Sequence, residues 1–388
     1  MTDQSLQQSL PFRAGTARPS PARAALPALA SVDRAAWQAL CGRRLEGNGL
    51  FEPGFALPAA ALAHGGRALL AGDNHLLAGL LPVSTAWAAL RLPLPLLIAR
   101  QPYSVLGTPL LDAADPDAAA DGLLAAAAAS GAEALLIPDL PLDGGAAEAL
   151  RRAMARRGPA GRIDNIRQRA VLDATAEAED YLRAGLGAKK LKELRRLANR
   201  MAEEGAVRFA EAATPEEIGP AMERFLVLEA SGWKGRRGTG LGQNPADAAF
   251  ARTIAGELGA LGKFRMLELW LGETLVAAGT VIRQGDHALF FKIAFDEAFS
   301  RFSPGVQLTV ELTRRLCGDP EIRFADSSAI EGHPMIDHVW RERMRVGDLY
   351  IPLGPLGRPV IAAAVARFHA REAAKSFYHK LKFWEKRK

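Results

Sequence analysis

The sequence predicts a mixed α/β protein in which mixed, mostly antiparallel sheets are flanked by helices. Apolar strand patterns alternate with alanine-rich helical patterns over residues 31–165. Residues 263–296 hold three strand patterns joined by short Gly-containing turns, which predicts an antiparallel meander. A helical pattern and one more strand pattern follow over residues 304–326. A crossover helix of this kind makes the last strand parallel to its predecessor.

The chain has 388 residues, which is long enough for two domains. Residues 1–30 mix Gln, Ser, Pro, Ala and Arg without a continuous apolar segment, which predicts a disordered leader and no export signal. Two domains of sheet and helix are expected over residues 31–165 and 166–355. Residues 356–388 are expected to form a basic amphipathic C-terminal helix.

The composition is that of an ordinary globular protein, with 49% hydrophobic and 24% charged residues. A net charge of +6 favours anionic partners such as nucleotides, nucleic acid or acidic membranes. Cys41 and Cys317 show no metal or redox spacing, which argues against a disulfide framework and fits a reducing cytoplasm. The apolar stretch at 90–99 is too short and too rich in proline to span a bilayer.

Local signals place further elements along the chain. Gly72-Asp73-Asn74 separates two apolar runs and predicts a hairpin. Thr214 precedes a proline and two glutamates, which is the pattern of a capped helix start. Other expected helices cover residues 32–43, 178–205, 246–262 and 333–343, and other expected strands cover residues 134–141, 162–173, 206–212, 321–326 and 346–353.

The helix after the meander has an unusual start. Ser303 is a favoured N-cap residue, Pro304 suits the first helical position, and Gly305 allows close approach of another molecule to the backbone. The free N–H groups of Gly305, Val306 and Gln307 are expected to form an anion site at the positive end of the helix dipole. The alternative is that these residues are only an efficient helix cap.

Five segments carry a resemblance to a known family. They are NGLFEPGF (48–55), LGTPLLD (106–112), LEASGWKGRRGTG (228–240), FFKIAFDEAFSRFSPGVQL (290–308) and DSSAIEGHPMIDHVW (326–340). With them, the chain resembles the GNAT acyltransferase superfamily, and within it the CelD/BcsL-type acetyltransferases, which are related to the tandem GNAT domains of FemAB-type aminoacyltransferases. The resemblance covers residues 31–355.

The resemblance implies tandem GNAT-like domains and an acyl-CoA co-substrate. The pyrophosphate would lie at the helix N-terminus, and the pantetheine would pair with the exposed edge of a neighbouring strand. The expected CoA-binding residues are Arg301, Ser303, Gly305, Val306 and Gln307. The usual phosphate loop has the form Gln/Arg-x-x-Gly-x-Gly/Ala. This chain keeps the initial Arg301 and one glycine, which is offset.

Amide formation from a thioester needs a proton acceptor for the amine and donors for the developing oxyanion. Strict alternation along residues 287–296 places Lys292 on the face opposite Phe291, either pointing into the cleft or reaching solvent. Asp326 ends the strand after the anion-binding helix and is the first choice for base or ammonium anchor, with an Asx-turn as the alternative. The candidate catalytic residues are Asp326, His333, Lys292, Glu268 and Asp337.

His333 and Asp337 share a helix face and would orient each other if residues 333–343 are helical. No fourth ligand of clear spacing accompanies these two and His338, so no metal is predicted. Trp233, Lys234 and His287 are the expected substrate-binding residues, with a solvated basic loop as the alternative for the first two.

Two basic stretches bear on partners. Lys189, Lys192, Arg196 and Arg200 lie on one side of the helix expected over residues 178–205. No aromatic side chains are interleaved with them, so a nucleic-acid partner is not expected. The tail places Phe377, Leu381 and Trp384 on one face of a basic helix, which either docks on the protein itself or lies on an anionic membrane.

The sequence therefore predicts a cytoplasmic N-acyltransferase that transfers an acyl group from acyl-CoA to an amine acceptor. A peripheral site at the inner face of the membrane is the expected location if the tail binds lipid. The acceptor would be an amino sugar, a lipid amine or a polysaccharide precursor. The alternatives are an aminoacyl-tRNA-dependent ligase like the FemAB group and a non-catalytic accessory protein of envelope assembly.

Overall fold

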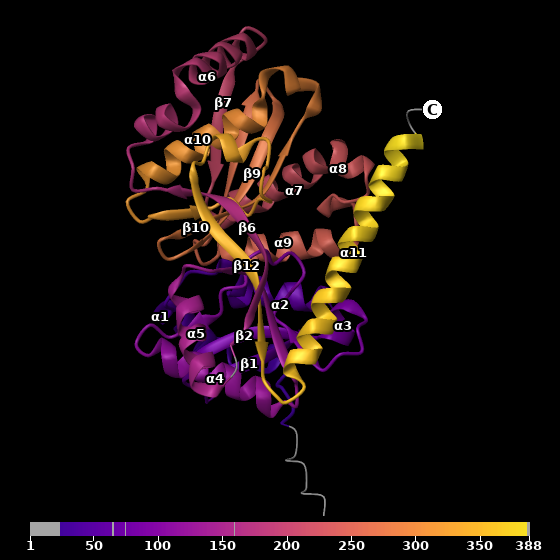
Figure 1. Ribbon diagram of the computed structural model, residues 1–388. Helices are drawn as coiled ribbons and strands as arrows, with labels where there is room; N and C mark the ends of the chain where they lie inside the picture. Colours follow the sequence, from indigo (N-terminus) through magenta and orange to yellow (C-terminus); the bar gives the residue numbers. More distant parts are fainter. Residues whose placement is uncertain (1–23, 64–65, 74, 159, 386–388) are drawn as a thin grey trace, which may run out of the picture.

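A computed structural model describes residues 24–63, 66–73, 75–158 and 160–385, and within these residues it contains one 12-stranded sheet. The strand order is β1-β2-β3-β5-β12-β6-β11-β10-β9-β8-β7, and β4 pairs with β2 outside this path. Figure 1 shows two lobes, an indigo and magenta lobe from the earlier residues and a mostly orange lobe from the later ones. The mixed, mostly antiparallel sheet with flanking helices confirms the predicted fold class.

The first lobe contains β1 to β5 and α1 to α5. Its strands are Arg67–Gly72 (β1), Leu77–Thr85 (β2), Leu96–Ile98 (β3), Leu110–Leu111 (β4) and Ala134–Pro141 (β5). Its helices are Arg34–Arg43 (α1), Pro53–Leu62 (α2), Ala86–Leu90 (α3), Pro116–Ala129 (α4) and Gly145–Arg157 (α5), with 3₁₀ turns at Leu29–Ser31 (η1) and Gly49–Phe51 (η2). The antiparallel pairing of β1 with β2 confirms the predicted hairpin.

The second lobe contains the meander and the helices around it. Its strands are Val207–Ala212 (β7), Phe264–Leu271 (β8), Thr274–Gln284 (β9), His287–Phe295 (β10) and Phe324–Asp326 (β11). Its helices are Ala178–Ala202 (α6), Pro215–Ser231 (α7), Trp233–Arg236 (α8), Pro245–Gly259 (α9) and Pro304–Gly318 (α10), with 3₁₀ turns at Leu241–Gln243 (η3), Glu297–Phe302 (η4) and Ile336–His338 (η5). Antiparallel β8–β9–β10 and parallel β10–β11 confirm the predicted meander and return strand.

Two long strands join the lobes. Strand β6 (Arg162–Asp173) pairs with β11 of the second lobe, and β12 (Glu342–Pro352) pairs with both β6 and β5. The predicted domain boundary at residue 165 falls inside β6. The last strand of the chain therefore returns to the first lobe, and the two lobes share one sheet.

Buried hydrogen bonds from the loop before α2 attach the first lobe to the second. The Asn48 side chain donates from Nδ2 to the carbonyl oxygens of Leu106, at 3.2 Å, and Thr108, at 2.9 Å. The Asn48 backbone N–H donates to Gln284 Oε1 at the end of β9, at 2.5 Å. Gln284 Nε2 in turn donates to buried Glu52, at 2.7 Å. Segment 48–55, one of those that carry the family resemblance, thus contacts β9 of the second lobe, and the Asn48 side chain fixes it to segment 106–112 within the first lobe.

The helix predicted over residues 333–343 is wrong. Only the short turn η5 is helical there, and β12 begins at Glu342. Asp337 Oδ2 accepts from Gly332 N at 2.8 Å and His333 Nδ1 accepts from the N–H groups of Met335 and Ile336, so side chains cap a single turn. The chain from Glu342 onward pairs with β6 and therefore does not continue a helix.

The N-terminal end of the described part packs against the first lobe, and the C-terminal helix starts there. Residues 1–23 of the predicted leader lie outside the described residues, whereas Leu29 is buried against the first lobe. Helix α11 (Gly357–Glu385) packs its first turns on β3, β5 and β12 and then extends along one side of the molecule (Figure 1). The side chains of Phe377, Leu381 and Trp384 lie outside the described part. No helix in the described ranges has the length and apolarity to cross a bilayer.

Candidate functional site

Strands β10 and β11 separate after three residue pairs. His287–Leu289 pairs in parallel with Phe324–Asp326, and the pairing then stops. Phe290 is the next residue of β10, and its carbonyl oxygen accepts a hydrogen bond from Ser328 Oγ at 2.5 Å. Beyond Phe290, no described strand pairs with this edge of β10. A gap therefore opens between β10 and the loop that follows β11.

A β-bulge between Phe290 and Lys292 changes the alternation of side chains along β10. Phe291 packs in the core that the second lobe shares with the first, and the Lys292 Nζ lies 5.4 Å from the centre of its ring. The prediction that these two residues lie on opposite faces is therefore wrong, because the extra residue of the bulge shifts the pleat. Lys292 Nζ also lies 5.0 Å from the ring centre of Tyr103, which belongs to the first lobe.

Helix α10 begins at Pro304 as predicted, but the side chain of Ser303 does not cap it. Ser303 has a left-handed backbone, with φ 53° and ψ 51°, whereas side-chain capping normally uses an extended N-cap residue. Its carbonyl oxygen accepts from Gln307 N at 3.0 Å, so Gln307 has no free N–H. The N–H groups of Gly305 and Val306 have no acceptor among the described residues. Two free donors, rather than the predicted three, stand at the positive end of the helix.

Two adjoining cavities lie at this place. The helix-end cavity has a volume of about 500 Å³ and is lined by Gly305 and Val306 at the start of α10. The strand-gap cavity has a volume of about 230 Å³ and is lined by Lys292 and Ser328. Both cavities are lined by Lys234, Ile293, His333 and Met335. The free amides of α10 therefore stand beside a space that continues into the gap between β10 and β11.

Lys234 occupies the wall between the two cavities. Its Nζ donates to Glu229 Oε1 at 2.8 Å and to the carbonyl oxygen of Ile293 at 3.0 Å. Glu229 is buried and also accepts from Leu241 N, at 2.8 Å. Lys234 thus covers one acceptor on the unpaired edge of β10. The neighbouring Trp233 is 44% exposed at the rim of the helix-end cavity.

His333 borders both cavities through the loop after β11. Its Nδ1 accepts from Met335 N and Ile336 N at 3.4 Å each, so the proton of the neutral ring is placed on Nε2. Burial lowers the pKa of the imidazole, although the charge of Asp337 acts in the opposite direction. The expected dyad does not form, because Asp337 Oδ2 accepts from Gly332 N instead. The neutral His333 is therefore a hydrogen-bond donor at Nε2.

Lys292 is a half-buried amine without an acceptor for its Nζ among the described residues. Burial lowers its pKa, the charge of Lys234 lowers it further, and the charges of Glu229 and Asp247 partly oppose this. The pKa of Tyr103 is raised by burial and by hydrogen bonding to Asp247. The amine of Lys292 therefore lies in a shielded, partly aromatic environment at the strand gap.

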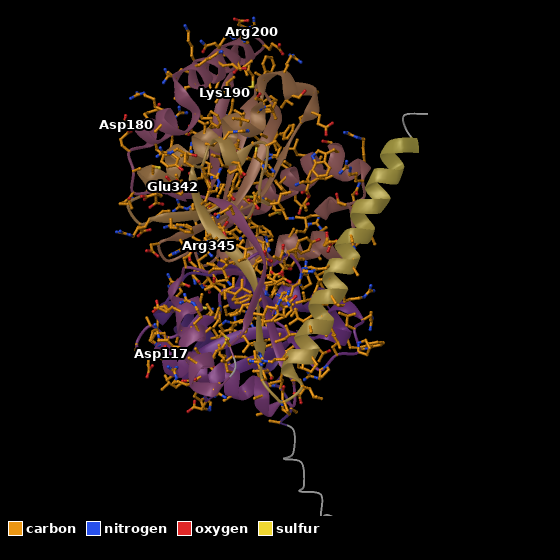
Figure 2. All side chains as sticks on the ribbon, viewed as in Figure 1. Asp117, Asp180, Lys190, Arg200, Glu342 and Arg345 are labelled. Atoms are coloured by element: carbon orange, nitrogen blue, oxygen red, sulfur yellow. The ribbon has the colours of Figure 1, made fainter. Side chains whose placement is uncertain are left out.

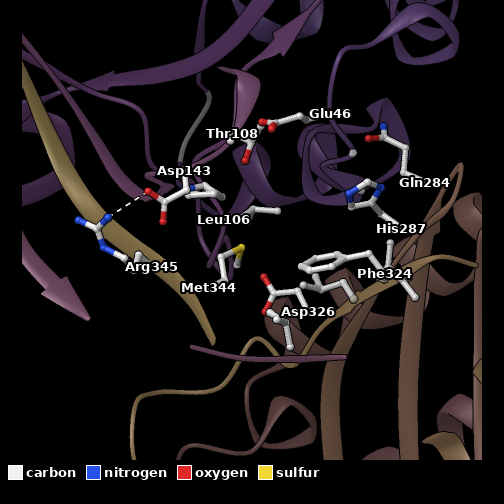
Figure 3. A pocket seen from close by; sticks show the side chains of 18 of the residues that line it. Glu46, Leu106, Thr108, Asp143, Gln284, His287, Phe324, Asp326, Met344 and Arg345 are labelled. Carbon is white, nitrogen blue, oxygen red and sulfur yellow. Dashed lines mark hydrogen bonds and ion pairs between the residues drawn. The ribbon is translucent and has the colours of Figure 1, made fainter. Parts of the chain in front are cut away.

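Asp326 and His287 lie elsewhere, on a third cavity of about 350 Å³ between the lobes (Figure 3). Asp326 is buried, and its Oδ2 accepts from buried Arg169 at 3.0 Å while its Oδ1 accepts from Ser328 N at 2.7 Å. The second bond is the Asx-turn that the sequence left as an alternative. His287 Nδ1 lies 2.8 Å from Asp286 Oδ1 on the far side of this inter-lobe cavity.

Three other predicted residues lie away from the two adjoining cavities. Arg301 points outward and pairs with Glu204, with a shortest N···O distance of 2.6 Å. Buried Gln307 donates from its side chain to the Phe302 carbonyl oxygen at 2.7 Å. Glu268 is buried on β8, where Arg224 donates two bonds to its carboxylate at 2.9 and 3.0 Å.

The sequence did not single out Glu229, Tyr103 or Met335. Glu229 stands in the 228–240 segment and could have been found as an acid five residues before Lys234. Tyr103 and Met335 carry no local signal, because their contacts with Lys292 and Gly305 come from distant segments. In the described ranges, no group of three His, Cys, Asp or Glu side chains is arranged to hold a metal ion.

Comparison with known proteins agrees with this geometry. Residues 188–331 match the family model described as Acetyltransferase (GNAT) domain, and this range includes β10, α10 and β11. The second lobe thus has the GNAT acetyltransferase fold. No curated protein sequence matches the chain.

Two solved structures extend the similarity to both lobes. FemX is 11% identical, with a TM-score of 0.56, over 86% of this chain and 98% of that chain. L-PGS from Bacillus licheniformis is 14% identical, with a TM-score of 0.52, over 85% of this chain and 95% of that chain. At these identities the likeness concerns the fold alone, and it covers the joined lobes rather than one of them.

Proposed function

We propose that this chain is an N-acyltransferase of the CelD/BcsL type that transfers an acyl group from a CoA thioester to an amine. The observation that carries this proposal is the pair of free N–H groups on Gly305 and Val306 beside the helix-end cavity, which continues into the strand gap. Helix N-termini with free N–H groups bind phosphate oxygens. The pyrophosphate would lie at α10, and the thioester arm would extend along the unpaired edge of β10.

The groups beside the strand gap fit direct attack by an amine. Asp326 is held by Arg169 and Ser328, whereas Lys292 has no acceptor among the described residues, so Lys292 is the better proton acceptor in its neutral form. The Nε2–H of His333 would donate to the oxygen of the thioester as negative charge develops there. The acceptor proposed is an amino sugar, a lipid amine or a polysaccharide precursor. The basic C-terminal helix supports a cytoplasmic site at the inner face of the membrane.

The test is CoA binding, measured by calorimetry and by the shift of thermal unfolding with CoA and acetyl-CoA. The variants best suited to it are at Val306, because a Cβ at Gly305 would lie only 3.0 Å from Met335 Sδ and would disturb packing. Val306→Asp places a negative charge at the free amides, which favours the helix but repels a diphosphate. Val306→Asn loses the same packing without the charge and is the matched control.

The proposal predicts that the wild type binds CoA, that Val306→Asp loses binding, and that Val306→Asn retains most of it. Both variants should unfold at similar temperatures, with Val306→Asp equal or higher because its carboxylate complements the helix dipole. Absence of CoA binding by the wild type would contradict the proposal. Equal binding by the two variants would place the diphosphate somewhere other than α10.

A second candidate is an aminoacyl-tRNA-dependent ligase, which one surface feature favours. Lys189, Lys192, Arg196 and Arg200 of α6 are exposed and have no acidic partner among the described residues. Figure 2 shows that α6 carries Lys190 and Arg200 at the end of the second lobe away from the first. Retention of tRNA at low salt and its release at high salt, without CoA binding, would support this candidate instead.

A further inference from the structure

We propose that Lys292 is a self-acylation site, at which the side-chain amine takes the acyl group of a bound thioester when no amine acceptor is present. The inference rests on the proposed function, because the thioester has to occupy the strand-gap cavity. It adds a covalent modification of the chain itself and a way for acceptor supply to control the site.

The position of Lys292 carries the inference. The bulge in β10 turns its side chain to the strand gap, where it lines the cavity next to Ser328. Its Nζ lies 5.0 Å from the ring centre of Tyr103 and 5.4 Å from that of Phe291. Among the described residues no carboxylate, carbonyl or hydroxyl oxygen accepts a hydrogen bond from it. The lone pair of a neutral Lys292 is therefore not committed to a partner.

The second lysine at these cavities is not equivalent. Lys234 Nζ is held by Glu229 Oε1 at 2.8 Å and by the Ile293 carbonyl oxygen at 3.0 Å. An amine held by two oxygen acceptors at these distances is not free to turn towards a thioester carbonyl carbon. Lys190 on α6 is an exposed lysine that pairs with Glu193 at 3.0 Å, and it represents the surface lysines of the chain. Lys292 is thus distinguished from Lys234 by the lack of a partner, and from the surface lysines by its place in the strand-gap cavity.

The groups around Lys292 keep part of it neutral. Burial is the largest influence on its pKa and lowers it. The charge of Lys234 on α8 lowers the pKa of Lys292 further, whereas the charges of Glu229 on α7 and Asp247 on α9 raise it. Two other titratable side chains face Lys292. They are Tyr103 of the first lobe and His333 of the loop after β11, and the pKa of His333 is itself lowered. The neutral fraction of Lys292 therefore begins to rise at a lower pH than that of an exposed lysine.

The chemistry balances without a further reactant. The Nζ lone pair attacks the thioester carbonyl carbon, a C–N bond forms, and the C–S bond breaks. CoA leaves as the thiolate, which takes up the proton that Nζ loses and becomes the thiol. The product is a neutral amide on Lys292. Because this amide can no longer accept a proton, acylation would switch the site off, and a bound amine acceptor would prevent it by reacting first.

The experiment incubates the purified full-length protein with acetyl-CoA in the absence of an amine acceptor. Intact-mass measurement and peptide mapping then follow the number and position of acetyl groups at several pH values. Lys292→Arg keeps a cation but removes the nucleophile, and Lys190→Arg is the control on the surface. The same incubation with urea-unfolded protein measures the background acetylation of lysines, which does not depend on a folded binding site. CoA binding is measured in parallel by calorimetry.

The inference predicts a single acetyl group on Lys292, its loss in Lys292→Arg, its retention in Lys190→Arg, and a labelling rate that rises with pH. CoA binding without labelling of Lys292, or labelling spread over exposed lysines as in the unfolded chain, would overturn the inference and leave the proposed function standing. Absence of CoA binding would overturn both. An acetylated Lys292 that appears equally fast in a Val306→Asp variant without CoA affinity would also overturn it.

Discussion

Ser328 Oγ donates to the main-chain carbonyl oxygen of Phe290 at 2.5 Å, across the point where β10 and β11 separate. The backbone of Ser328 is left-handed, with φ 51°, and its N–H is held by Asp326 Oδ1 at 2.7 Å. One residue therefore fixes the loop after β11 to Phe290, the first residue of β10 beyond its last pair with β11. The width of the strand gap depends on this bond.

Ser328→Ala should loosen the gap. Loss of one buried hydrogen bond costs about 1 kcal/mol in unfolding free energy, and we expect CoA affinity to fall with it because the loop after β11 is released. Urea unfolding and calorimetry measure the two effects. Ser327→Ala is the control, since Ser327 Oγ only accepts from Ala329 N within the same loop, at 3.2 Å. Equal CoA affinity in both variants would show that the bond does not set the gap.

Asn48→Ala should destabilise the first-lobe loop that contacts β9, although the backbone N–H that bonds to Gln284 is kept. Asn48 is fully buried, and its side chain satisfies the carbonyl oxygens of Leu106 and Thr108. Leaving these two acceptors unpaired should cost about 2–6 kcal/mol of unfolding free energy, since each unsatisfied buried group costs about 1–3 kcal/mol. Asn199→Ala on exposed α6 is the control and should change little. A lower unfolding midpoint for Asn48→Ala alone would confirm this cost, and an unchanged urea-unfolding curve would contradict it.

The protonation of His333 should make the protein less stable in acid. Its pKa is lowered in the folded state, so between the folded and unfolded pKa values the unfolded chain binds more protons. The stability that comes from the neutral ring is thus fully present when the pH is above 6.5, the ordinary pKa of histidine, and it is lost as the pH falls below that value. His333→Asn should lose less stability than the wild type between neutral and mildly acidic pH. Parallel curves of melting temperature against pH would contradict this.

The elements that the sequence predicted are those with local signals. The meander turns, the Thr214 capping box and the start of α10 at Pro304 each depend on residues that are neighbours in the chain, and all three are present. Where tertiary pairing decides the conformation, the local signal misleads. The 333–343 segment was expected to be helical, yet its last two residues pair with β6 as the start of β12, and β6 is distant in the sequence.

The parts of the site that the sequence did not predict depend on distant residues. A bulge leaves no pattern in composition, so strict alternation placed Lys292 on the face opposite Phe291, which was wrong. Tyr103 lies far from Lys292 in the chain and comes from the other lobe. The role of Asp326 was ambiguous for the same reason, because its partner Arg169 is 157 residues away.

Asp326→Asn separates a structural role from a catalytic one. Asp326 and Arg169 are both buried, with 3.0 Å between Oδ2 and Nη1, and Arg169 Nε has no partner in the described part of the chain. Removing the charge of Asp326 leaves the guanidinium poorly compensated, although Asp139 Oδ1 lies 3.4 Å from its Nη2. Breaking one partner of a buried pair costs about 3–5 kcal/mol of unfolding free energy, and we expect a loss near the lower end of that range.

The double variant Asp326→Asn with Arg169→Met completes this test. If the aspartate serves mainly to compensate the guanidinium, removing both charges should recover most of the lost stability, because no unpaired buried charge remains. Urea unfolding of the two single variants and the double variant gives the coupling between them. CoA-dependent acyl transfer in the double variant should then persist. If stability is recovered but transfer is abolished, Asp326 rather than Lys292 is the proton acceptor.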